Sequence, residues 1–173
     1  TVVATDAAGN ANEQAVSLSI NNVDDTGPAV SSVAITSATG VQNNTLNAGD
    51  VVNVTVTMNE TTTVTGTPRV ALNIGGSTVY ADYVSGSGTA ALVFQYTVLP
   101  GQTDANGIAL NADSLSLNGS TLKDPRTNTT TLSVPAAADN SSYTVDTTAP
   151  FLSITSDVAQ VKVGETANIT FTF

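Results

Sequence analysis

The 173-residue chain contains no cysteine and no histidine. Without cysteine it cannot form a disulfide, a thiolate metal site or a cysteine nucleophile. Histidine is the commonest general base, so the commonest base and the strongest nucleophile are both missing. A Ser–Lys or paired-carboxylate site stays open in principle, but neither Lys123 nor Lys162 lies in a recognisable nucleophile motif. We therefore expect that the chain is not an enzyme.

Basic residues are almost as scarce. The chain has 14 acidic residues, four basic ones and a net charge of −10. A nucleic-acid-binding protein needs a basic surface, so we expect no nucleic-acid partner. No apolar run approaches the roughly 18 residues that span a membrane, so we expect no direct membrane insertion. The acidic surface either attracts cations or only keeps the protein soluble.

Alternating apolar residues dominate what is present. Every second residue is apolar in the segments 52–58, 70–74 and 92–98, which is the pattern of half-buried strands. Glycine- and serine-rich turns lie between them, at 75–77 and 85–88. Segments at 30–36, 78–84, 107–110, 114–119 and 130–134 complete the set. The pattern predicts an all-β, antiparallel β-sandwich of about seven strands.

Three short motifs occur twice, in the same order. VDDTGP at 23–28 is similar to VDTTAP at 145–150, TDAAGN at 5–10 to KDPRTN at 123–128, and NAGDVVNVTV at 47–56 to KVGETANITF at 162–171. The offsets are 122, 118 and 115 residues, which is the size of a domain. We predict three parts: residues 1–25 as the last strands of one repeat, 26–146 as a complete domain, and 147–173 as the first strands of the next repeat.

With these motifs, residues 26–150 resemble the tandem immunoglobulin-like repeats of giant bacterial surface adhesins, of the RTX and biofilm-associated types. AGDVVNVTVTMNE, GTPRVALNIGGS, FQYTVLPGQTDANGIAL and LNGSTLKDPRTN carry the resemblance. It implies an immunoglobulin-like sandwich, an extracellular position at the bacterial cell surface, and a role as a stalk that supports cell adhesion or biofilm formation. Its partners would be neighbouring repeats of the same chain. DPRTN lacks the glycine of DAAGN, which leaves its turn geometry open.

The resemblance also implies calcium at the joints between repeats. Ca²⁺ takes six to eight oxygen ligands, chiefly from carboxylates and carbonyls. The candidate ligands are Asp24, Asp25 and Asp146 in the joint motifs, Asp124 and Asn128 in the DPRTN loop, Asp6 in the DAAGN loop, and Glu60 at the end of a strand. The alternative is that these Asp and Asn residues only form turns. DANG at 104–107 lacks the distal Glu of an EF-hand and is interpreted as a turn.

Two other functions stay open: a module that binds a glycan or a protein, and an accessory domain of a secreted enzyme. Three or more further copies in the gene would favour the stalk, and one copy beside a catalytic domain would favour the accessory domain. The incomplete repeats at the two ends cannot each close a core. We therefore expect that the chain ends can pair with each other, or with ends of neighbouring chains, by strand complementation.

Overall fold

The computed structural model describes residues 2–15, 26–134 and 136–173, and these residues form strands, turns and loops without a helix. The strands are β1 (Val2–Thr5), β2 (Ala11–Gln14), β3 (Val30–Thr39), β4 (Thr45–Leu46), β5 (Val51–Thr65), β6 (Arg69–Ile74), β7 (Ser77–Ser85), β8 (Thr89–Thr97), β9 (Thr103–Asp104), β10 (Ala109–Ser116), β11 (Thr121–Lys123), β12 (Thr144–Asp146), β13 (Ser153–Ser156) and β14 (Ile169–Thr172). The predicted all-β, antiparallel class is confirmed. Over the same residues, no helix is long and apolar enough to cross a membrane.

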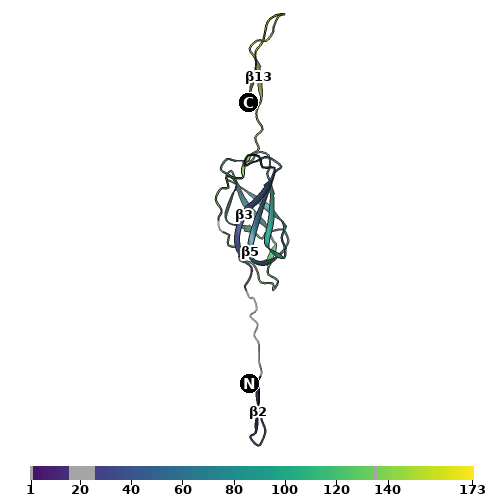
Figure 1. Cartoon of the computed structure of the whole chain (residues 1–173), viewed down its shortest axis with the longest axis vertical. Coiled ribbons are helices and arrows are strands. Elements are labelled where there is room, and N and C mark those ends of the chain that lie inside the picture. Colours follow the sequence, from purple (N-terminus) through teal and green to yellow (C-terminus); the bar gives the residue numbers. More distant parts are fainter. Residues whose placement is uncertain (1, 16–25, 135) are drawn as a thin grey trace.

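The strands β3 to β12 form one unit, which we call the central unit. It is built on one curled sheet of seven strands (Figure 1). Its order is β10-β6-β7-β8-β5-β11, and β3 also pairs with β5. All of these pairs are antiparallel. The register shifts within β3–β5, β5–β8, β7–β8 and β6–β10. Such irregularities bend strands and increase their twist, which favours a curled sheet over a flat one.

A second, small sheet has the order β4-β12-β9, in which β4 and β12 run parallel. The predicted number of seven strands thus matches the curled sheet alone. The expected strand over 130–134 is wrong, because this segment forms only the isolated bridge between Thr131 and Ala29. Its backbone N–H groups bond to different segments and do not form a ladder with one strand. The N–H of Thr130 donates to Leu122 O, and that of Thr131 donates to Pro28 O.

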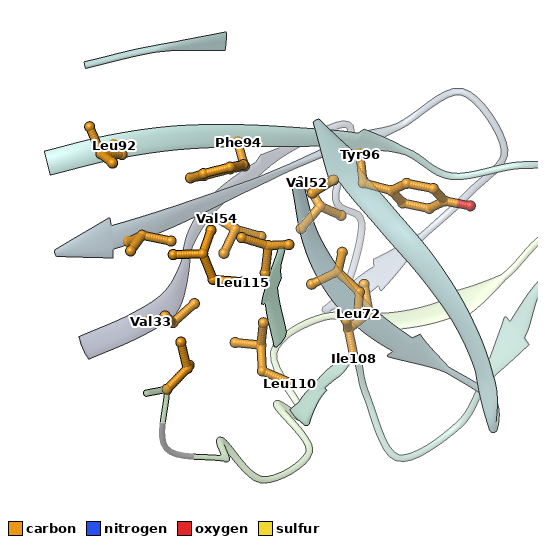
Figure 2. Packing of buried hydrophobic residues seen from close by; sticks show 14 of the residues in the cluster. Val33, Val52, Val54, Leu72, Leu92, Phe94, Tyr96, Ile108, Leu110 and Leu115 are labelled. Atoms are coloured by element: carbon orange, nitrogen blue, oxygen red, sulfur yellow. The ribbon is translucent and has the colours of Figure 1, made fainter. Parts of the chain in front are cut away.

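The core lies inside the curl of the large sheet, and the small sheet contributes to it. Val52, Val54 and Val56 of β5 are fully buried, as the alternation predicts, while the intervening Asn53 and Thr55 are only half-buried. Figure 2 shows apolar side chains of several strands meeting in one cluster. The small sheet adds Leu46 and Val145 to this cluster. Period-2 patterning therefore decides which face of each strand is buried.

Two hairpins lie outside this unit. β1 pairs only with β2, and β13 pairs only with β14, each as a separate antiparallel sheet. All side chains of β1, β2 and β14 are exposed, and of β13 only Ser153 is half-buried. Figure 1 shows the β13–β14 hairpin standing away from the central unit. Neither hairpin therefore contributes to the core.

Candidate functional site

The first joint is the point where the chain enters the central unit at Thr26. The Asp124–Asn128 loop, which follows β11, lies beside it. One carboxylate oxygen of Asp124 accepts hydrogen bonds from the backbone N–H groups of Arg126 and Asn128, both at 2.8 Å. Its other oxygen accepts one from the Asn128 amide at 2.7 Å. The same amide reaches the Thr26 carbonyl at 3.4 Å, so the loop contacts the incoming linker directly.

The incoming linker continues along the segment that follows this loop. Pro28 is buried, its carbonyl accepts from Thr131 N at 2.9 Å, and Ala29 forms a parallel bridge with Thr131. A Cβ atom added to Gly27 would lie 1.9 Å from the Thr129 carbonyl oxygen. Only glycine fits this close approach of two backbones. Residues 26–29 of the linker are thus docked to the domain.

The same loop geometry occurs at the tip of the β1–β2 hairpin. Asp6 accepts from the backbone N–H groups of Ala8 and Asn10 and from the Asn10 amide, at 2.9, 2.9 and 3.0 Å. Gly9 has φ +85°, and Thr127 has φ +75° at the corresponding position of the other loop. The motif without its glycine therefore keeps the turn geometry, although β-branched residues rarely adopt positive φ.

These hydrogen bonds set the protonation of the aspartates. The Asn10 side chain and neighbouring backbone N–H groups lower the pKa of Asp6 below its ordinary value of 3.8. Burial acts to raise the pKa of Asp124, but hydrogen bonds from Asn128, Arg126 and Thr127 outweigh it, so the net shift is downward. Both carboxylates are therefore charged at neutral pH, and they accept hydrogen bonds from N–H groups of their own loops.

The second joint is the point where the chain leaves the central unit after β12. The Thr147 hydroxyl accepts from Gly101 N at 2.8 Å and donates to Gln102 O at 2.9 Å. One carboxylate oxygen of Asp146 accepts from Thr148 N at 2.9 Å. The Gln102 side-chain carbonyl accepts from the Tyr96 hydroxyl at 3.0 Å, which ties this loop to β8. The outgoing linker is therefore held by direct hydrogen bonds as well.

A hollow of about 480 Å³ opens beside the second joint. Its lining residues are Thr45, Gly75, Thr103, Asp104, Ala105, Asn106, Thr144, Val145 and Asp146. Asp104 is buried, and its carboxylate accepts from the backbone N–H groups of Gly75, Asn106 and Gly107. The DANG segment is thus a turn closed on its own aspartate, and no aromatic side chain lines the hollow.

The structure distributes the predicted calcium ligands over several places. Asp124 and Asn128 lie together at the first joint. Glu60 is in β5 and follows Asn59, whose side-chain oxygen accepts from Ala29 N of the incoming linker at 2.7 Å. Asp146 is at the second joint and Asp6 is in the N-terminal hairpin, while Asp24 and Asp25 lie outside the described residues. Within the described ranges, no three acidic side chains come close enough to hold a metal ion.

Sequence reasoning missed a third aspartate–asparagine pair, in the β13–β14 hairpin. Asp157 accepts from the backbone N–H of Asn168 at 2.9 Å and from its side-chain amide at 2.8 Å. These contacts lower the pKa of Asp157. The repeat aligns Asn168 with Asn53, which also bonds across to the neighbouring strand, at Ser37.

Comparisons of the chain with protein-family models, with curated protein sequences and with solved structures find no match.

Proposed function

We propose that the chain is a structural extender repeat from the stalk of a bacterial cell-surface adhesin, with residues 26–146 as an immunoglobulin-like sandwich outside the cell. The observation that carries the proposal is the docking of both linkers. Asn128 and Thr131 hold the incoming linker, and Gly101 and Gln102 hold the outgoing one. A domain that fixes both of its linkers transmits a defined direction from one neighbour to the next, as a stalk requires.

The two joints lie near opposite ends of β5, which supports the same proposal. Asp50, just before β5, bonds to Val98 close to the second joint, while Thr63 near its other end pairs with Lys123, next to the Asp124 loop. β5 has 15 residues, and at about 3.3 Å per residue an unbroken strand of this length would span roughly 45 Å. The register shift between Thr57 and Thr62 shortens it, so the joints are separated by about 35–45 Å. Each repeat would therefore add length to the stalk and would not fold the chain back.

Matching turns support the assignment of residues 1–25 and 147–173 to neighbouring repeats. The Asp6 and Asp124 loops share their hydrogen bonds, as described above. In the other pair, Asp50 Oδ2 accepts from Asn47 N at 2.7 Å, and Glu165 Oε2 accepts from Lys162 N at 2.9 Å. The glycine before each acid has positive φ, +94° and +90°. Equivalent turns at equivalent positions are expected of tandem copies of one unit.

The proposal includes calcium at the joints, because the resemblance to adhesin repeats implies it. The described residues do not by themselves supply the six to eight oxygens of a calcium site, because Asp124 and Asn128 satisfy each other. Asp24 and Asp25 precede Thr26 directly in the sequence, so the first joint, with Glu60 nearby, is the place we propose for the ion. The hydrogen bonds that hold the linkers stiffen the joints independently of calcium.

The calcium part is tested by thermal unfolding of the chain in millimolar calcium and in EDTA, with magnesium as the control cation. Binding to the folded state alone raises the unfolding midpoint as calcium rises. Replacing Asp24 and Asp25 by Asn should abolish the rise. An equal midpoint in calcium and EDTA would remove calcium from the proposal and leave the hydrogen-bonded joints.

The extender role is tested by small-angle scattering from a protein with two copies of residues 26–150 in series. We expect a maximum dimension close to twice that of one copy. The control carries a longer Gly-Ser linker in place of residues 147–149, which removes the Thr147 contacts and should broaden the distance distribution. Two copies folded side by side would contradict the proposal.

Of the alternatives, a glycan-binding module has the least support. The hollow at the second joint has no aromatic lining. The exposed Tyr80 is already covered on one face by the Arg69 guanidinium, 3.9 Å from the ring centroid. A protein-binding module and an accessory domain of a secreted enzyme differ from the stalk in needing no fixed linkers.

A further inference from the structure

The chain contains two Asn–Gly pairs, at 106–107 and at 118–119. Asparagine followed by glycine is the dipeptide most prone to spontaneous deamidation, because glycine has no side chain to shield its backbone nitrogen. That nitrogen attacks the carbonyl carbon of the asparagine side chain, and ammonia leaves. In a folded protein, the rate depends on how easily the backbone nitrogen reaches this carbon.

The pair at 106–107 is held by its surroundings. The Gly107 N–H donates to the buried carboxylate of Asp104 at 2.9 Å, and the Asn106 N–H donates to the same oxygen at 3.3 Å. The side-chain amide of Asn106 donates to Asp139. Gly107 is buried, and a Cβ atom added to it would lie 2.1 Å from the Asn140 carbonyl oxygen. The attacking nitrogen is therefore engaged, and its backbone is packed against another segment.

The pair at 118–119 lies at the tip of the turn between β10 and β11, where both residues are exposed. Asn118 and Gly119 have φ +48° and +78°, and Ser120 N donates to Leu117 O at 2.8 Å, as in a two-residue hairpin turn. In the part of the chain that the structure describes, the Gly119 N–H has no hydrogen-bond acceptor. The Asn118 amide makes a long contact with Thr67 O, at 3.3 Å.

The two pairs differ in what has to open before the nitrogen can attack, because the asparagine backbone must first rotate out of its turn. At 118–119 the rotation breaks the bond from Ser120 and the long contact with Thr67, and the space beside Gly119 is open. At 106–107 it breaks the bonds to two aspartates and separates two segments in contact. Local opening therefore costs less free energy at 118–119.

We propose that Asn118 is a site of spontaneous deamidation and isomerisation in the folded chain. The Gly119 nitrogen forms a bond to Asn118 Cγ, its proton passes to the side-chain nitrogen, and that nitrogen leaves as ammonia, which gives a cyclic succinimide. Water then adds to one of the two ring carbonyls. Opening at Cγ gives aspartate, and opening at the main-chain carbonyl gives isoaspartate, in which the backbone runs through the former side chain. The proposal rests on this turn and not on the stalk function.

The isoaspartate product changes the turn that positions β11. It places an extra carbon atom in the backbone between β10 and β11, and it carries a negative charge where the Asn118 amide donated to Thr67. β11 pairs with β5 over Thr121–Lys123 and leads into the Asp124 loop at the first joint. We therefore expect isoaspartate to loosen β11, whereas Asn118→Asp keeps the backbone length and reports the effect of the charge alone.

The test is incubation of the native chain at mildly alkaline pH, both in buffer and in urea that unfolds it. A protease that cleaves before aspartate then releases residues 104–112, which contain Asn106, and residues 113–123, which contain Asn118. Mass spectrometry gives the extent of deamidation in each peptide, and fragmentation assigns it to one asparagine. The protease cuts before aspartate and not before isoaspartate, so it also distinguishes the two products.

In buffer we expect deamidation at Asn118 to be at least about tenfold faster than at Asn106, because the two turns differ in the free energy of local opening. In urea the two rates should become similar, because only the fold distinguishes the two pairs. Equal rates in the folded chain, or a faster reaction at Asn106, would overturn the proposal. So would an unreacted Asn118 in the folded chain after a time in which the unfolded chain reacts.

Two further measurements separate cause from consequence. Asp139→Ala frees the Asn106 amide and should speed deamidation at Asn106 while leaving the rate at Asn118 unchanged. The isoaspartate fraction of the aged chain should unfold at a lower temperature than Asn118→Asp. Equal unfolding midpoints would exclude the effect on β11.

Discussion

Replacing Thr127 by glycine should stabilise the central unit. Thr127 has φ +75° in the Asp124 loop, and the equivalent position in the N-terminal hairpin is Gly9, at φ +85°. An L residue in the left-handed region costs about 1–2 kcal/mol. Glycine avoids this cost but loses about 0.5–1 kcal/mol through the larger entropy of its unfolded chain. The net gain in unfolding free energy is about 0.5–1 kcal/mol, or roughly 2–4 °C in the unfolding midpoint.

The assay is urea and thermal unfolding of the full chain, followed by circular dichroism. Arg126→Gly is the matched control, because Arg126 is the neighbouring loop residue and does not have positive φ. That control should lose about 0.5–1 kcal/mol, since it adds unfolded-state entropy without relieving strain. If Thr127→Gly were as destabilising as Arg126→Gly, the loop would not hold position 127 in the left-handed region, and the reasoning would be refuted.

Three further predictions concern the first joint and the core. In urea unfolding, Gly27→Ala should destabilise the central unit by about 1–3 kcal/mol, because the added Cβ would lie 1.9 Å from the Thr129 carbonyl oxygen. The control Ala149→Gly, at the matching position of the second joint, should change the unfolding free energy little. Leu72→Ala should cost about 2–5 kcal/mol in the same assay, because Leu72 is fully buried. The lowered pKa of Asp124 adds stability that is present above about pH 4 and is lost as the pH falls through the folded-state pKa. Asp124→Asn should therefore flatten the acid side of a curve of unfolding free energy against pH. An unchanged curve would exclude this contribution.

Strands with strict alternation could be predicted from the sequence because burial on one face selects the residues directly. The segments around Val54, Leu72 and Phe94 are of this kind. The small sheet could not be predicted, because β4, β9 and β12 have only two or three residues each and show no period. The gathering of seven strands in one curled sheet also depends on bulges and long-range pairing, which leave no local pattern.

The first joint was predictable in part. The D-x-x-x-N spacing places Asp124 and Asn128 in one loop, and the structure has them in contact. The contact of Asn128 with Thr26 could not be predicted, because it joins residues 102 positions apart. The same limit applies to Thr147, whose partners in the Gly101–Gln102 turn are 45 and 46 positions away. Asp157 and Asn168 were missed because only the hairpin pairing of β13 with β14 brings them together.

The distance between the two joints is the most direct measure of the central claim that each repeat carries the chain from one end of the domain to the other through fixed linkers. Spin labels at Thr26→Cys and Thr148→Cys are the only thiol adducts in a chain without native cysteine. Pulsed electron paramagnetic resonance should give one narrow distribution centred at about 35–45 Å, set by the length of β5 and by its register shift between Thr57 and Thr62. A distribution centred below about 30 Å would contradict the claim, because the joints would not lie at opposite ends of β5. A distribution spread over several tens of ångströms would also contradict it, because the linkers would not be fixed.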